Sequence, residues 1–75
     1  MTMVGVPREI KRDEHRVGLV PESVRILASQ GHVVVVESGA GQGIGAPDAD
    51  YIAAGARIAA DARAVWESAS LIVKV

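Results

Sequence analysis

A chain of 75 residues has room for one small domain, and its net charge of −1 gives no electrostatic reason to expect binding to nucleic acid or to an anionic membrane. Hydrophobic residues make up 49% of the chain and aromatic residues only 3%, so we expect a globular fold with a core of Val, Ile, Leu and Ala. The absence of cysteine excludes disulfides and thiolate metal sites and fits a reducing, cytoplasmic environment.

The first predicted element is a short buried strand over residues 3–6, which ends at Pro7 because proline has no N–H for a β-ladder. A charged loop follows as far as Leu19 and holds four of the chain's eight Lys and Arg residues: Arg8, Lys11, Arg12 and Arg16. Open α/β sheets bind ligands beyond the carboxyl ends of their strands, so this loop is a candidate site. Arg16 is its candidate ligand-binding residue, since a guanidinium donates two parallel hydrogen bonds to a carboxylate or phosphate. The alternative is a solvated loop without a ligand.

Other residue types in or near this loop could also carry chemistry. Its carboxylates are Glu9, Asp13 and Glu14. No apolar residues surround them that would raise a carboxyl pKa, so ion pairs with neighbouring Arg and Lys are favoured over acid–base catalysis. His15 could help to shape an anion pocket, whereas His32 is interpreted as an ordinary residue at a strand entry. No second histidine or carboxylate lies at a spacing typical of a metal site.

The next element is a helix that begins at Pro21, a residue type suited to the first helical position. Its apolar face comprises Val20, Val24, Leu27 and Ala28. Val20 has no side-chain oxygen to cap the helix, and Gly31 is expected to end it. Residues 32–37 then contain four consecutive valines, which is typical of a parallel strand covered on both faces and far too short for a membrane span. Strand, helix and strand together predict a right-handed βαβ unit.

The second half of the chain predicts a short helix from a cap at Asp48 to about Ala54, a brief extended piece over residues 56–59, and a third helix capped by Asp61. The third helix is expected to bury Ala62, Val65 and Ala69, with Trp66 beside them in the core.

A third strand is predicted over residues 71–75, where the given sequence stops. The fold is therefore predicted to be α/β: a three-stranded parallel sheet in the order 2-1-3, with helices around it in a three-layer, Rossmann-like (flavodoxin-type) arrangement. Because a domain rarely ends inside a buried strand, we expect this chain to be the incomplete N-terminal portion of a longer protein.

The stretch Gly41–Ala46 matches GxGxxA, a variant of the dinucleotide-binding fingerprint, and Asp61 lies at about the distance expected for its acidic residue. The fingerprint works only where its glycines open a helix whose N-terminus meets the pyrophosphate. Here Pro47 and Asp48 put the helix start after the motif. A glycine-rich turn is therefore favoured, and no cofactor-binding residue is assigned.

Four stretches carry a resemblance that spans the chain in order: VGVPREIKRDEHRVGLVP, SQGHVVVVESGAGQG, DADYIAAGA and VWESASLIVKV. They resemble the N-terminal domain of the alanine dehydrogenase and nicotinamide nucleotide transhydrogenase family. The DEHRVGL stretch is more similar to alanine dehydrogenase. Val20 departs from the family, which often has a threonine there that can cap the helix.

The resemblance implies an NAD-dependent enzyme that reversibly deaminates L-alanine to pyruvate and ammonia, with hydride transfer from the substrate Cα to the nicotinamide. In the family's ExRV motif the arginine, here Arg16, binds the substrate carboxylate. The substrate lysine is the second lysine of a KVKEP-like stretch, whereas Lys74 matches the first, so Lys74 does not inherit that role. The catalytic histidine and aspartate and the NAD-binding domain would lie beyond residue 75. We therefore expect the chain alone to have no catalytic residues, no bound cofactor or metal, and no activity.

The complete enzyme would be a cytoplasmic homo-oligomer, as the resemblance implies. Two alternatives stay open: the N-terminal part of the alpha subunit of a proton-translocating NAD(P) transhydrogenase, and a non-catalytic remnant of the fold.

Overall fold

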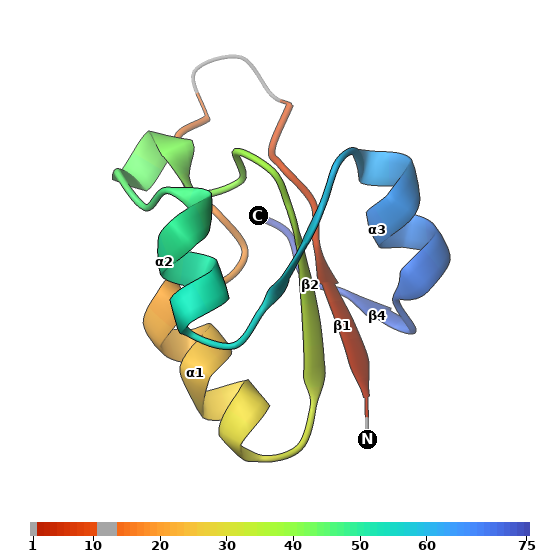
Figure 1. Cartoon of the computed structure of the whole chain (residues 1–75). Helices are drawn as coiled ribbons and strands as arrows, with labels where there is room; N and C mark the ends of the chain where they lie inside the picture. The colour runs from red at the N-terminus through yellow and green to blue at the C-terminus, as the bar shows by residue number, and fades with distance from the viewer. Residues whose placement is uncertain (1, 11–13) are drawn as a thin grey trace.

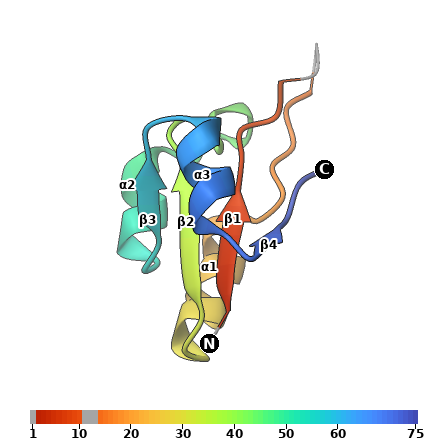
Figure 2. The ribbon, with the colours of Figure 1, turned by 90° about the vertical axis from the view of Figure 1, so that its right-hand side faces the viewer.

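The computed structural model describes residues 2–10 and 14–75, which form a parallel sheet with helices on both faces. The strands are β1 Met3–Val6, β2 Val33–Glu37, β3 Arg57–Ala59 and β4 Leu71–Ile72. The helices are α1 Pro21–Ser29, the 3₁₀ helix η1 Gln42–Ile44, α2 Asp48–Ala53 and α3 Ala62–Ser68. Helices α1 and α2 lie on one face of the sheet and α3 on the other, so the predicted three-layer α/β fold is confirmed (Figures 1 and 2). Lys11, Arg12 and Asp13 lie outside the described residues, and so does the expected ion pairing of Asp13.

The sheet has four strands in the order β3-β2-β1-β4, all parallel, where three were predicted. The predicted order of the three expected strands is found in β2-β1-β4. The additional strand is β3, where only a brief extended piece was expected; it pairs with β2 from Val35↔Arg57 to Glu37↔Ala59. Three residues at a sheet edge are too few to show an alternating pattern, so the pairing comes from the neighbouring strand rather than from local sequence.

The last predicted strand is shorter than expected, because β4 comprises Leu71–Ile72 rather than residues 71–75. Its partner β1 ends at Val6, before Pro7, which has no N–H to extend the ladder. The chain then leaves the sheet, and the N–H of Val75 donates to Glu9 Oε2 at 3.0 Å.

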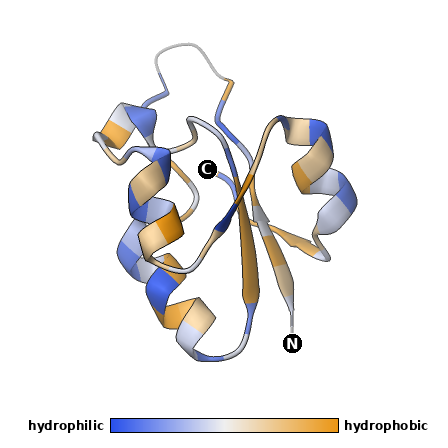
Figure 3. Cartoon of the chain, in the orientation of Figure 1, coloured by the Kyte–Doolittle hydropathy of each residue, from blue (hydrophilic) through white to orange (hydrophobic). Residues whose placement is uncertain are grey.

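The valines of the two central strands form the core on both faces of the sheet. On the α1/α2 face, Val4, Val6, Val34 and Val36 pack with Val24 and Tyr51. On the α3 face, Val35 packs with Ala59 and Val65. Strands β1 and β2 are accordingly coloured as apolar, whereas the helices alternate between apolar and polar residues (Figure 3). No helix within residues 2–10 and 14–75 is long and apolar enough to cross a membrane.

Most predicted helix ends are confirmed. Val20 is the N-cap of α1 without a side-chain hydrogen bond, and Gly31 follows the helix with a φ of +87°. Asp61 caps α3, since its Oδ1 accepts a hydrogen bond from Ala64 N at 2.9 Å. The predicted cap at Asp48 is wrong, because the N-cap of α2 is Pro47 and the Asp48 carboxylate turns to another loop.

The assignment of Trp66 to the core is also wrong, since Trp66 is 54% exposed. Val65 is the residue of α3 that points at the sheet, and the next helical position is rotated by about 100° away from it. Helix α3 crosses β1 so closely at Gly5 that an added Cβ would lie 2.6 Å from Ala69 Cβ and 2.8 Å from Val65 Cγ1. The space between this helix and β1 therefore has no room for a methyl group at Gly5.

Gly5→Ala is therefore expected to destabilise the chain by about 1–3 kcal/mol, the usual cost of overpacking a close-packed interior. Urea unfolding followed by circular dichroism measures this change. Gly31→Asn is the control, because Asn tolerates a positive φ and no atom lies within 4 Å of an added Cβ there. Equal stability of Gly5→Ala and the parent chain would contradict the close approach of α3 to β1.

Candidate functional site

The candidate site lies at the carboxyl ends of β1 and β2, where the loops that follow these strands meet (Figure 1). These loops line an open cavity of about 260 Å³. Its walls come from the loop after β1 and from the glycine-rich turn after β2: Arg8, Glu9, Glu14, His15, Arg16, Gly39, Ala40, Gln42 and Gly43. The structure thus brings Arg16, His15 and two of the candidate carboxylates together at this edge of the sheet.

Two glycines allow the loop that carries Arg16 to lie against its neighbours. A Cβ added at Gly43 would lie 2.4 Å from His15 O and 2.7 Å from His15 Cα, so the glycine-rich turn contacts the loop backbone directly. A Cβ added at Gly18 would lie 2.3 Å from Val73 O, so the same loop also contacts the segment after β4. Both contacts involve backbone atoms, which cannot move aside as the end of a flexible side chain can. The loop is therefore held between two other segments on either side of Arg16.

Tyr51 of α2 holds the last residue of this loop, Leu19, through a hydrogen bond. The Tyr51 side chain is fully buried, and its hydroxyl donates a hydrogen bond to Leu19 O at 2.8 Å. Burial raises the pKa of the Tyr51 phenol, because the interior disfavours the phenolate. Gly41 makes room for the ring, since a Cβ added there would lie 2.5 Å from Tyr51 Cε2.

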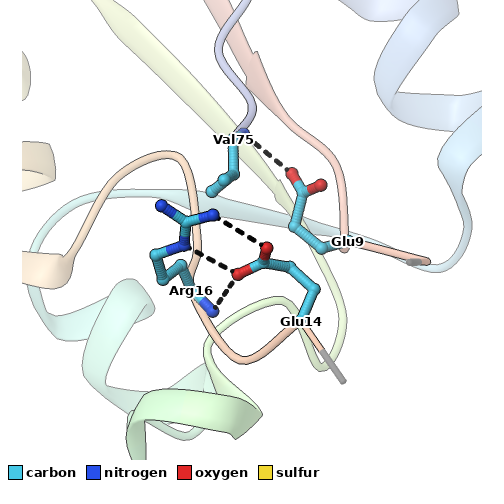
Figure 4. A network of polar contacts seen from close by, with 4 residues as sticks. All are labelled: Glu9, Glu14, Arg16 and Val75. Atoms are coloured by element: carbon cyan, nitrogen blue, oxygen red, sulfur yellow. Dashed lines mark hydrogen bonds and ion pairs between the residues drawn. The ribbon is translucent and has the colours of Figure 1, made fainter. Parts of the chain in front are cut away.

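Arg16 and Glu14 form a bidentate ion pair on the wall of the cavity (Figure 4). Arg16 Nε donates to Glu14 Oε1 at 2.9 Å, and Arg16 Nη2 donates to Glu14 Oε2 at 3.0 Å. The backbone N–H of Arg16 also donates to Glu14 Oε1, at 2.9 Å. These hydrogen bonds and the charge of Glu14 raise the pKa of Arg16 above its ordinary value. The predicted ion pairing of a loop carboxylate with a neighbouring arginine is thus confirmed for Glu14, whereas Glu9 accepts from a backbone N–H.

The two histidines and Lys74, which the sequence also offered as candidates, lie in three different places. His15 lines the cavity, as its proposed part in an anion pocket requires. His32 lies at the entry of β2, where its Nδ1 accepts a hydrogen bond from Thr2 N at 3.2 Å. Lys74 lines a different cavity, of about 210 Å³, together with Ile10 and Trp66. Among residues 2–10 and 14–75, no three His, Asp or Glu side chains are grouped so that they could hold a metal ion.

The prediction that the glycine-rich run does not open an α-helix, made from the positions of Pro47 and Asp48, is confirmed. The run contains the 3₁₀ helix η1, and α2 begins only at Asp48. The Asp48 carboxylate closes the run instead, accepting from Gly39 N at 2.9 Å and from Ser38 Oγ at 2.6 Å. These two hydrogen bonds lower the pKa of Asp48. No local pattern predicts that Gly43 seats the loop, because its contact is with His15, 28 positions earlier in the chain (43 − 15).

The cavity wall carries hydrogen-bond donors and positive charges that suit an anion. Arg8 and Arg16 are exposed cations on its wall, and the described part of the wall adds His15 and the polar edge of the glycine-rich turn. A guanidinium in such a cleft suits a carboxylate or a phosphate.

Comparison with known proteins identifies relatives over nearly the whole chain. Residues 5–75 match the family model described as alanine dehydrogenase/PNT, N-terminal domain. The chain is 50% identical over 72 residues to an alanine dehydrogenase of Halomonas elongata, covering 96% of this chain and 19% of that protein. A solved L-alanine dehydrogenase superimposes with a TM-score of 0.92 at 49% identity, covering 96% and 20% of the two chains. A transhydrogenase structure from Sinorhizobium meliloti gives a TM-score of 0.82 at 43% identity, covering 96% and 21%. The chain thus spans about a fifth of the length of these relatives.

Gly43→Ala is expected to lower the free energy of unfolding by about 1–3 kcal/mol, because the new methyl group would overlap the His15 backbone. Helix propensity alone would predict the opposite sign, a gain of roughly 0.5–1 kcal/mol. Urea unfolding decides between them. Ile44→Ala, in the same turn and 43% exposed in the parent chain, is the control and should change stability little. A Gly43→Ala variant as stable as the parent would show that the loop does not rest on this turn.

Proposed function

The chain belongs to the alanine dehydrogenase/PNT N-terminal domain family, and on this basis we propose that it is the N-terminal part of the substrate domain of an NAD-dependent L-alanine dehydrogenase. The complete enzyme would interconvert L-alanine with pyruvate and ammonia. This segment would contribute Arg16, which binds the substrate carboxylate.

The observation that carries the proposal is the guanidinium of Arg16 in a small cavity at the carboxyl ends of β1 and β2. Ligands of open parallel sheets bind at this edge. The cavity, at about 260 Å³, is smaller than the pockets of roughly 300–1,000 Å³ that take drug-sized ligands, which suits a substrate of a few heavy atoms. Arg16 also matches the arginine of the family's ExRV motif, as the sequence resemblance implied.

Arg16 would act by orientation and charge rather than by proton transfer. A guanidinium stays protonated at every physiological pH, and the ion pair with Glu14 raises its pKa further. Two parallel hydrogen bonds to the carboxylate would fix the substrate so that its Cα meets the hydride acceptor in one geometry. NAD, held by another domain, would supply that acceptor.

The family resemblance also implies the setting of the whole enzyme. We propose a cytoplasmic homo-oligomer of amino-acid metabolism, with its catalytic histidine and aspartate and its NAD-binding domain outside this segment. Lys74 is not assigned to the substrate, which is consistent with its position in a different cavity from Arg16.

The second candidate function is hydride transfer between nicotinamide nucleotides in a transhydrogenase. It is supported by the similarity to the Sinorhizobium meliloti structure, at 43% identity against 49% for L-alanine dehydrogenase. The whole protein that carries this segment distinguishes the two in a single assay. NADH oxidation that depends on pyruvate and ammonia supports the dehydrogenase, and NADH oxidation that depends on NADP⁺ alone supports the transhydrogenase.

Arg16→Lys in the whole enzyme is expected to lower kcat/KM for pyruvate by roughly 30- to 1000-fold, or about 2–4 kcal/mol of transition-state stabilisation. Lysine keeps the positive charge and loses the planar pair of donors, so the change is not conservative at a carboxylate site. NADH affinity, followed by fluorescence, should stay the same.

Arg63→Lys is the matched control, because Arg63 also pairs with a glutamate but lies exposed on α3, with Nε at 3.5 Å from Glu67 Oε2. It should leave kcat/KM within about twofold of the parent. Near-normal efficiency of Arg16→Lys toward pyruvate would refute the assignment of Arg16.

The 75-residue chain alone is expected to give no saturable NAD⁺ binding in isothermal titration calorimetry. The spaces beside Gly41 and Gly43, which a pyrophosphate would need, face Tyr51 and the His15 backbone. Saturable binding to the chain that is lost in Gly43→Ala would instead assign a nucleotide site to the glycine-rich turn.

A further inference from the structure

The ion pair in the cavity uses only part of the hydrogen-bonding capacity of Arg16. A guanidinium presents two edges with parallel N–H groups, one formed by Nε and Nη2 and the other by Nη1 and Nη2. Glu14 takes the first edge, with its two oxygens at 2.9 and 3.0 Å from Nε and Nη2. Within residues 2–10 and 14–75, Nη1 has no hydrogen-bond partner, and Figure 4 shows it pointing away from Glu14. The second edge is thus available to a ligand.

We propose that Glu14 is a positioning residue of this site, which holds the Nε/Nη2 edge of Arg16 and leaves the Nη1/Nη2 edge to the substrate carboxylate. This inference rests on the proposed function, and it adds which edge of Arg16 the substrate uses and what orients that edge. The substrate carboxylate joins the ion pair as a second partner of the guanidinium and does not displace Glu14.

The geometry favours a lasting pair over displacement for two reasons. Glu14 Oε1 also accepts the backbone N–H of Arg16 at 2.9 Å, so displacement would break three hydrogen bonds at once. The Glu14 side chain is only 12% exposed whereas that of Arg16 is 75% exposed, so Glu14 belongs to the wall and Arg16 reaches from it into solvent. A wall residue that holds an exposed long side chain is the arrangement expected of an orienting group.

Holding the Arg16 side chain in one rotamer before binding is expected to increase the affinity for the substrate carboxylate. A free arginine side chain has many rotamers, and a ligand that fixes one of them loses binding free energy to the lost entropy. Glu14 fixes the rotamer before the ligand arrives. The His15 backbone beneath the pair is itself held against Gly43, so the orientation is transmitted from the glycine-rich turn to the guanidinium.

The first test is Glu14→Gln in the whole enzyme, with steady-state kinetics at varied pyruvate. Glutamine has one acceptor oxygen in place of two and puts an amide donor against the guanidinium. We expect KM for pyruvate to rise roughly 10- to 100-fold, with a much smaller change in kcat and an unchanged NADH affinity. Glu67→Gln, which removes the exposed partner of Arg63, is the control and should alter none of these values. A lower KM in Glu14→Gln would overturn the inference, because it would mean that Glu14 competes with the substrate.

The second test needs no turnover and measures the contact directly. Phenylglyoxal attacks the guanidinium in its neutral form, and peptide mass spectrometry of the whole protein that carries this segment reports the extent of modification at each arginine. Glu14→Gln is expected to speed modification of Arg16 several-fold relative to Arg63, since both the blocked edge and the raised pKa are lost. An unchanged ratio would overturn the inference whatever the kinetics show. Faster modification in a protein that never turns over pyruvate would reject the proposed reaction while retaining Glu14 as the group that holds Arg16.

Discussion

The whole arrangement depends on backbone segments that approach one another more closely than any side chain would allow. Gly43 lies against the His15 backbone, Gly18 against Val73 O, and Gly5 against Ala69 of α3. A Cβ at any of these positions would come within 2.6 Å of another atom, which real structures do not tolerate without movement. The sheet, the Arg16 loop and the glycine-rich turn are therefore coupled, and the position of the candidate binding residue is set by packing rather than by the loop's own conformation.

Because the loop is held in place, the ion pair between Glu14 and Arg16 also holds the positive charge of the guanidinium in one position. Exposed ion pairs usually contribute little to stability, because water screens them and the side chains lose entropy. This pair differs in its use: its partners are two residues apart, it is bidentate, and one partner is part of the cavity wall. Its value lies in orientation, since the guanidinium is held without occupying both of its edges. The candidate site is thus organised around a held guanidinium, which suits an anion.

Local sequence was sufficient where one residue decides a local structure. Pro7 ends β1, Gly31 ends α1 with a positive φ, and Asp61 caps α3, each as its chemistry predicts. It was insufficient for Asp48 and Trp66. Asp48 is a residue type that often caps helices, but its carboxylate oxygens accept hydrogen bonds from Gly39 N and Ser38 Oγ instead. Trp66 has the hydrophobicity of a core residue, but Val65 is the residue of α3 that points at the sheet, and the next helical position faces away from it.

By itself the sequence determined the α/β class, the parallel pairing of the valine strands and Arg16 as the candidate for binding a carboxylate, because valine runs, turn residues and guanidinium chemistry act within a few residues. Only the tertiary structure decided that β3 joins the sheet, that the glycines of the GxGxxA stretch seat the loop, and that Glu14 leaves one edge of Arg16 open. The physical reason is distance along the chain: strand pairing at an edge and backbone contact across 28 residues (43 − 15) depend on where the fold brings the segments, and no local pattern encodes that.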